Sequence, residues 1–327
     1  MRSISELQTI INLEIEKESQ LLAETIPVNL YIPIKYALDM GGKRLRPLMV
    51  LLGYDLFSSK IKNAIPTALG IEIFHNFTLL HDDIMDNADM RRNKPSVHQK
   101  FNANAAILSG DAMSFISFQY ILKSISDHLT DVLELFSNTA VEVCEGQQFD
   151  MDFEDSIDVK EGEYLRMIQL KTAVLLGCSL KAGALLANIT GKRAEELYNF
   201  GVNLGIAFQL QDDLLDTYGD EKTFGKKIGG DIVANKKTFL AIKAMELADN
   251  NQKKDLLSWM WKKEFKGKEK IKAVTSIFND LNVKEITQQK IDAYFNAASE
   301  NIKKLRLSGG QKKQLRQLSN ILLNRNS

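Results

Sequence analysis

The sequence predicts an all-α fold built as a multi-helix bundle. Apolar residues recur at three- and four-residue spacing through long segments, which is the period of one helix face. Strand signals are nearly absent, because no Asn-Gly or Asp-Gly turn separates alternating apolar runs. All five prolines fall in the first third of the chain, so the rest contains no proline to break a helix. A parallel sheet is therefore not expected.

We expect a helix wherever the apolar period is sustained, with ends placed to within about four residues. No linker rich in Pro, Gly or Ser divides the chain, so residues 1–327 are expected to form one domain. The expected helices are 3–24, 29–40, 46–57, 64–87, 102–123, 128–151, 159–186, 192–217, 235–248, 252–264, 268–279, 284–301 and 310–324.

The composition argues against several classes of function. Lysine plus arginine and aspartate plus glutamate number 42 each, so no global charge favours nucleic acid or an anionic membrane. Cys144 and Cys178 form no C-x-x-C pattern, which argues against zinc or redox chemistry and fits a reducing cytoplasm. The N-terminus lacks the continuous apolar stretch of a signal peptide. The most apolar stretch, 172–189, is interrupted by Lys181, and we expect a buried core helix there rather than a transmembrane segment.

An Asp-Asp-x-x-Asp motif, formed by Asp82, Asp83 and Asp86, lies in an otherwise apolar helical segment. Asp82 and Asp86 are one helical turn apart and share a face. Three acids crowded on an apolar helix repel each other and resist desolvation unless a cation neutralises them. Mg²⁺ prefers carboxylate oxygens and commonly bridges one or two of them to phosphate oxygens. The motif therefore predicts a magnesium site for a diphosphate or triphosphate.

The same motif recurs at Asp212, Asp213 and Asp216, after a second apolar helical segment. One acidic cluster alone could equally be a solvated helix end, where acids are ordinary. Two identical clusters on separate helices make that interpretation much weaker. Carboxylate metal sites in helical bundles are built from facing helices in this way.

Basic residues lie close to the first motif and near a predicted helix start. In Gly41–Pro47 the glycines loosen a turn, and Lys43 and Arg46 then flank a helix N-terminus, where anions are favoured. A solvated basic turn remains the alternative for this segment alone. Arg91 and Arg92 follow the first motif and could contact diphosphate oxygens that a metal leaves uncovered.

A glycine-rich segment, 223–231, follows the second motif and carries Lys226, which suggests a loop able to close over a phosphate. It does not have the spacing of a P-loop. Lys171 and Thr172 begin a helical stretch, and Gln209 lies three residues before Asp212. Each of these, taken alone, is more typical of a structural residue.

From Gly41 to Lys236 the chain resembles the trans-type polyprenyl diphosphate synthases, which include geranyl, farnesyl and geranylgeranyl diphosphate synthases. The resemblance rests on the Gly-Gly-Lys-Arg-Leu-Arg-Pro segment and the paired aspartate motifs. It implies an isoprenoid synthase fold, with helices around a central cavity. It also implies a Mg²⁺-dependent condensation of an allylic diphosphate (dimethylallyl, geranyl or farnesyl) with isopentenyl diphosphate, carried out by a homodimer.

The resemblance also implies roles for single residues. Asp82, Asp86 and Asp212 would coordinate Mg²⁺, with Asp83, Asp213 and Asp216 in support. Catalysis would involve the set Lys171, Thr172, Gln209 and Lys226, of which Thr172 and Gln209 would steady the allylic cation. Arg91 would lie near the allylic diphosphate with Lys236 as a further lysine, whereas isopentenyl diphosphate would be bound by Lys43, Arg46, His75 and Arg92.

Product length is expected to depend on the helix that carries the first motif. Phe77 lies five residues before Asp82, roughly 7.5 Å along the helix, where an aromatic limits chain length in short-chain relatives. A helical wheel places Thr78 rather than Phe77 nearest the Asp82 face, so this role for Phe77 comes from the resemblance. The first motif has no insertion between its aspartates, which resembles the geranylgeranyl (C20) type, with farnesyl (C15) next.

Three alternatives remain open. A class I terpene cyclase shares the helical bundle and first motif but usually replaces the second, which is intact here. A non-catalytic partner subunit of a heteromeric synthase would have damaged motifs. A metal phosphohydrolase is disfavoured, because no histidine pairs with an acid at metal-ligand spacing.

Overall fold

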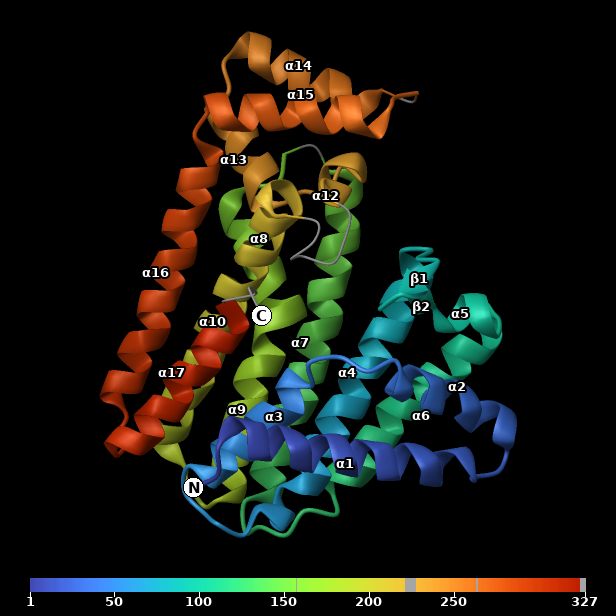
Figure 1. The fold of residues 1–327 in the computed structure, drawn as a ribbon, viewed down its shortest axis with the longest axis vertical. Helices are drawn as coiled ribbons and strands as arrows, with labels where there is room; N and C mark the ends of the chain where they lie inside the picture. The colour runs from blue at the N-terminus through green and yellow to red at the C-terminus, as the bar shows by residue number, and fades with distance from the viewer. Residues whose placement is uncertain (157, 221–227, 263, 324–327) are drawn as a thin grey trace. The chain divides into compact units, whose positions relative to one another are not determined.

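The computed structural model describes residues 1–156, 158–220, 228–262 and 264–323. Within these ranges the chain is almost entirely helical, and the one sheet is a two-stranded hairpin, β1 (Met90–Arg91) with β2 (Lys94–Pro95) (Figure 1). The predicted all-α class is confirmed. The long helices are α1 (Ile4–Ala23), α2 (Val28–Asp39), α3 (Leu45–Asp55), α4 (Ile65–Met85), α6 (Ala103–Ile121), α7 (Leu129–Asp155), α8 (Glu161–Ile168), α9 (Val174–Leu186), α10 (Gly191–Tyr218), α13 (Phe239–Leu247), α14 (Asn250–Trp261), α15 (Gly267–Asp280), α16 (Val283–Lys304) and α17 (Gly309–Leu323).

The chain forms two compact units, each assembled from two separate stretches of sequence. The first unit comprises Met1–Ser137 and Cys178–Tyr198, and the second comprises Asn138–Gly177 and Asn199–Ser327. The long helices α7 and α10 each contribute residues to both units. The expectation of a single domain stays a prediction.

The first unit has its core around α4 and α6, which lie side by side (Figure 1). Phe74 on α4 is fully buried and packs edge-to-face on Phe136, with ring centroids 5.1 Å apart. Phe118 on α6 also packs edge-to-face on Phe136, with ring centroids 4.9 Å apart. Such edge-to-face pairs add to the gain from burial, so this cluster fixes the helix that carries the first aspartate motif.

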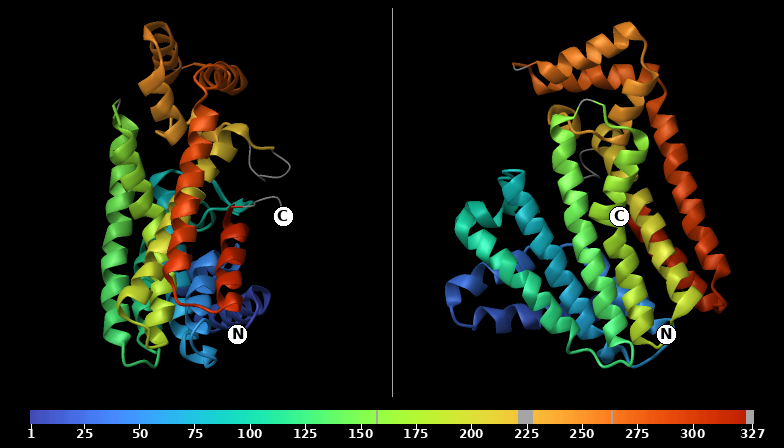
Figure 2. Two further views of the ribbon diagram at one scale, coloured as in Figure 1. Left: turned by 90° about the vertical axis from the view of Figure 1, so that its left-hand side faces the viewer. Right: turned by 180° about the vertical axis from the view of Figure 1, so that it is seen from behind.

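In the second unit, α14 and α15 pack side by side in every view (Figures 1 and 2). Asp249 starts α14 as a capping box, because its side chain accepts from the backbone N–H of Gln252 while the Gln252 side chain accepts from the backbone N–H of Asp249. α15 buries Val274 and Phe278 along one face. These two helices, with α13 and the short helix α12 (Gly230–Val233), follow the second motif in the sequence.

A π-helical turn, Gln169–Ala173, interrupts the continuous helix formed by α8 and α9. Such turns are uncommon and occur often at functional sites. Gly146 on α7 permits it, since a Cβ there would lie 2.2 Å from the backbone N of Lys171. The close approach of α7 to this turn therefore depends on the missing side chain.

All the expected helices are present, with ends within four residues of those expected, except that the helix expected from residue 159 contains the π turn. The sequence did not predict the short elements: the 3₁₀ turn Ile61–Asn63, α5 (Val97–Lys100), α12 and the β hairpin. The hairpin was not predicted because its turn residues are Arg92 and Asn93, both with positive φ, instead of an Asn-Gly or Asp-Gly pair.

One helix within the described residues, Glu161–Leu186, is long and apolar enough to cross a membrane by composition. Its apolar window is 78% buried inside the protein. That burial is typical of a core helix, as expected for residues 172–189.

Candidate functional site

The first aspartate motif occupies the last turn of α4. Asp83 is 2% exposed and accepts hydrogen bonds from Arg91 on β1, at 2.9 Å from Nε and 2.5 Å from Nη2. Burial raises the pKa of Asp83, an effect that Arg91 partly offsets. The Arg91 Nη2 atom also lies 3.5 Å from Asp82 Oδ2. The β hairpin thus brings a cation directly beside the acidic helix end.

The second motif lies in the last turns of α10 and has the same internal arrangement. Asp213 is 4% exposed, accepts a hydrogen bond from Gln209 Nε2 at 3.1 Å and is bonded by the hydroxyl of Tyr164. Burial and the nearby Asp231 carboxylate raise the pKa of Asp213 to about 8. Asp216 Oδ2 accepts the backbone N–H of Asp231 at 2.9 Å, which anchors α12 to this end of α10.

In both motifs the middle aspartate is buried and held by protein donors, whereas the first aspartates, Asp82 and Asp212, are only partly buried. The outer carboxylates offer the oxygen donors that a hard cation prefers, so the residues present fit Mg²⁺. Among the described residues, no group of three or more His, Cys, Asp or Glu side chains forms a ready-made metal cage. Magnesium held partly by substrate phosphates does not require one.

Lys171 and Thr172 both lie in the π-helical turn of the second unit. Lys171 Nζ is 2.5 Å from Asp150 Oδ2 on α7. The Thr172 hydroxyl donates to Gln209 Oε1 at 3.4 Å. Gln209 therefore links Thr172 to Asp213, and these three predicted site residues are brought together within one unit.

A cationic cluster forms in the first unit, around the start of α3 and the middle of α4. Arg44 is buried and forms an ion pair with Glu72, which also accepts from Asn76 at 2.9 Å. Arg44 thus has a structural role as the ion-pair partner of Glu72. Arg46 Nη1 donates to His75 Nε2 at 3.0 Å, which leaves His75 as the acceptor.

The electrostatics of that cluster suit an anion. Burial lowers the pKa of Arg46 to about 10 and, together with the surrounding arginines, holds the pKa of His75 well below its usual value. His75 is therefore neutral near pH 7. The buried Arg46 Nε atom has no hydrogen-bond partner, an uncommon situation that a bound oxyanion would relieve. Arg92 donates to the carbonyl of Gly41, so the hairpin and the Gly41–Pro47 segment meet here.

The remaining predicted residues are placed as follows. Lys43 and Lys236 are exposed, each at the surface of its own unit. Phe77 stacks edge-to-face on His81 at 4.8 Å and contacts Phe74, so it lies on a different face of α4 from Asp82, as the helical wheel indicated. Thr78 donates to the carbonyl of His75. Lys226 lies outside the described residues.

Sequence reasoning missed several residues of these clusters. Tyr164 and Asp150 belong to no motif, and Asp231 ends the glycine-rich segment 223–231 but was given no role of its own. Glu72 and Asn76 were detectable, because two polar residues one turn apart inside an apolar helix require a buried partner.

Known proteins match this chain over most of its length. The polyprenyl synthetase family model matches residues 27–278. A short chain isoprenyl diphosphate synthase of Methanocaldococcus jannaschii is 42% identical over 73% of each chain. A geranylgeranyl diphosphate synthase of Methanosarcina mazei is 42% identical over 69% of this chain and 71% of its own. A geranylfarnesyl diphosphate synthase of Natronomonas pharaonis is 37% identical over 75% and 76%.

Among solved structures, a crystal structure of geranylgeranyl pyrophosphate synthase superposes with a TM-score of 0.93 at 43% identity, covering 100% of both chains. The match confirms the predicted isoprenoid synthase fold. Together with the family model, it confirms the resemblance to the trans-type polyprenyl diphosphate synthases. The chain belongs to the polyprenyl synthetase family.

Proposed function

We propose that this prenyltransferase is a Mg²⁺-dependent short-chain isoprenyl diphosphate synthase whose main product is geranylgeranyl diphosphate, with farnesyl diphosphate next. It would condense isopentenyl diphosphate with dimethylallyl, geranyl or farnesyl diphosphate and release diphosphate. The observation that carries the proposal is the shared design of the two motifs. Each one buries its middle aspartate against protein donors, while its first aspartate is only partly buried, which supports a role for the first aspartate as a metal ligand.

Magnesium, when bound, would be held by Asp82, Asp86 and Asp212 and would stabilise the negative charge that develops on the leaving diphosphate. Arg91 supplies a positive charge beside the first motif, and Lys171 supplies another beside Asp150. These cations lower the barrier to departure because they are already oriented before the bond breaks.

The allylic cation left behind needs polar but non-nucleophilic neighbours. The Thr172 hydroxyl and the Gln209 amide are suited to this, because they hold each other in place and neither attacks carbon readily. The double bond of isopentenyl diphosphate attacks the cation, and a proton is then lost to the departing diphosphate. No side-chain nucleophile is required.

Isopentenyl diphosphate would bind to Lys43, Arg46, His75 and Arg92. Arg46 carries the unpaired buried Nε donor, and neutral His75 accepts from Arg46 and so fixes the orientation of its guanidinium. Lys236 would add a cation near the allylic substrate. Lys226 keeps its proposed role by resemblance alone.

Two outcomes would favour other functions. A terpene cyclase would convert an allylic diphosphate to a cyclic hydrocarbon without consuming isopentenyl diphosphate. A non-catalytic subunit would be inactive until a second chain is added. We further propose a homodimer in the cytoplasm, without a nucleic-acid partner.

The direct test uses the purified chain with isopentenyl diphosphate, Mg²⁺ and each allylic diphosphate in turn, followed by dephosphorylation and chromatography of the prenyl alcohols. We expect a C20 alcohol as the main product from all three primers. Cyclic hydrocarbon, or no elongation by the chain alone, would refute the proposal.

A further inference from the structure

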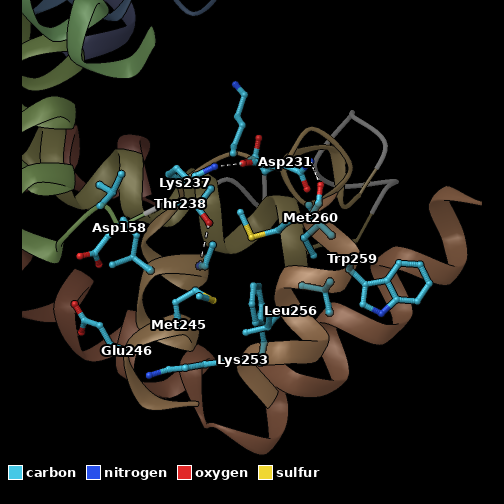
Figure 3. A pocket seen from close by; sticks show the side chains of 18 of the residues that line it. Asp158, Asp231, Lys237, Thr238, Met245, Glu246, Lys253, Leu256, Trp259 and Met260 are labelled. Atoms are coloured by element: carbon cyan, nitrogen blue, oxygen red, sulfur yellow. Dashed lines mark hydrogen bonds between the residues drawn. The ribbon is translucent and has the colours of Figure 1, made fainter. Parts of the chain in front are cut away.

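A cavity of about 520 Å³ lies within the second unit (Figure 3). It is walled by α12, α13, α14, α15 and the segment before α8. Its volume lies in the range of small-molecule sites in proteins. Its apolar lining includes Ile242, Met245, Leu256, Met260, Val274 and Phe278.

The lining favours an apolar ligand of adaptable shape. Met245, Leu256 and Met260 lie around the same space, with Lys237 and Thr238 above Met245 and Leu256 in Figure 3. Methionine side chains are flexible and polarizable, so such a wall can adjust to its occupant. Water in a cavity lined in this way makes few hydrogen bonds and is displaced at little cost.

The charges around the cavity favour an anionic group on that ligand. Five lysines and three carboxylates line it. Two of the carboxylates are matched by lysines, since Asp158 pairs with Lys160 and Glu246 with Lys243, which lies outside the lining. Lys253 on α14 and Lys270 on α15 add two further positive charges to the lining, which favour an anionic group.

One wall of the cavity is the segment that joins α12 to α13 and carries Lys236. Asn235 has a left-handed backbone and its side chain connects two helices: Lys270 Nζ on α15 donates to its Oδ1 at 2.6 Å, and its Nδ2 donates to the Met260 carbonyl on α14 at 3.1 Å. Lys270 is almost fully buried and also donates to the Val233 carbonyl at 3.2 Å. A ligand bound between α13 and α14 would therefore disturb the hydrogen bonds of the Asn235 side chain.

We propose that this cavity binds an apolar molecule carrying one anionic group, and that its occupation changes turnover by shifting the Asn235–Lys237 segment. This coupling between ligand binding and turnover rests on the proposed function. It acts through Lys236 and through Asp231, whose backbone N–H donates to Asp216. The binding itself does not depend on the reaction.

Decanoate is a suitable probe, with decylammonium as the matched cation of equal chain length. Trp259 lines the cavity and Trp261, the other tryptophan, is 65% exposed, so Trp261→Phe leaves one reporter at the site. We expect saturable change of Trp259 emission with decanoate, and affinity at least about tenfold weaker for decylammonium. No saturable change, or equal affinity for both probes, would overturn the site.

Ala241→Phe fills the cavity and is expected to abolish decanoate binding. Leu247→Phe, on the same helix but exposed and outside the lining, is the control and should bind normally. Should Ala241→Phe unfold, Met245→Glu replaces it and should reverse the preference toward decylammonium. Decanoate binding of normal affinity in the folded lining variant would place the ligand elsewhere and refute the assignment.

Coupling is measured as turnover with and without saturating decanoate. We expect at least a threefold change in the wild-type chain and none in the lining variant. Saturable binding without any change in turnover would refute the coupling. Failure of the unliganded wild-type chain to elongate would refute the proposed function and leave the binding result standing.

Discussion

Gly146→Ala tests the packing that places Lys171 and Thr172. An added Cβ would lie 2.2 Å from the Lys171 backbone N and 2.7 Å from the Leu170 carbonyl carbon. Ordinary contact begins at 3.4 Å, so α7 and the π-helical turn must separate by about 1 Å. Both neighbours are backbone atoms, and no flexible side chain can absorb the shift.

The expected cost has a stability part and a catalytic part. Overpacking costs about 1–3 kcal/mol, from which about 0.5–1 kcal/mol is recovered by replacing glycine inside a helix. A 1 Å displacement of catalytic groups typically costs about a hundredfold in rate. We therefore expect turnover to fall between about tenfold and a hundredfold, with a melting temperature lower by about 2–4 °C for each kcal/mol of net destabilisation.

Gly162→Ala is the matched control, since this glycine is exposed on α8 and a Cβ there meets nothing within 4 Å. It should keep full turnover and melt at the same or a slightly higher temperature. Turnover by scintillation counting of prenyl product and thermal unfolding by circular dichroism measure both parts. Unchanged turnover in Gly146→Ala would refute the claim that close packing on the π turn positions Lys171 and Thr172.

Three further outcomes are expected. Asp82→Ala and Asp212→Ala should each lose at least about a hundredfold in turnover, because each removes a metal ligand; near-normal steady-state rates in either variant would contradict the assignment. Phe77→Ala should lengthen the product by at least one isoprene unit, and an unchanged chromatogram would exclude Phe77 as a length determinant. His75 is held neutral when folded, with its pKa well below that of the unfolded chain. Below about pH 6.5 the unfolded chain takes up the proton first, so stability falls by up to about 1.4 kcal/mol per pH unit. The free energy of unfolding, measured in urea at pH 5.5 and at pH 7.5, should differ less between the two pH values for His75→Gln than for the wild-type chain. An equal difference in both chains would count against the neutral histidine.

Helix positions were predictable because apolar periodicity is a local property and this chain has few helix breakers. The hairpin was not, since its turn uses Arg92 and Asn93 in left-handed conformations that the tertiary structure imposes. The π turn was equally hidden, because it depends on the approach of Gly146 on another helix.

The site was predictable where charge repeats at a fixed spacing, as in the two aspartate motifs. Sequence could not tell the members of a motif apart. The separate role of the middle aspartates follows from non-local partners, Arg91 for Asp83 and Tyr164 for Asp213. In the same way, Arg44 and Arg46 look alike in sequence, but only Arg44 has Glu72 as an ion-pair partner.

The central claim is that both aspartate motifs are required to bind one allylic diphosphate with Mg²⁺. Calorimetry with an unreactive thio analogue of farnesyl diphosphate tests it on the wild-type chain, Asp82→Ala, Asp212→Ala and the double variant. We expect each single variant to lose at least about tenfold in Mg²⁺-dependent affinity and the double variant to bind no more than about threefold more weakly than the weaker single variant. Losses that multiply in the double variant, or a single variant that binds like the wild-type chain, would contradict the account.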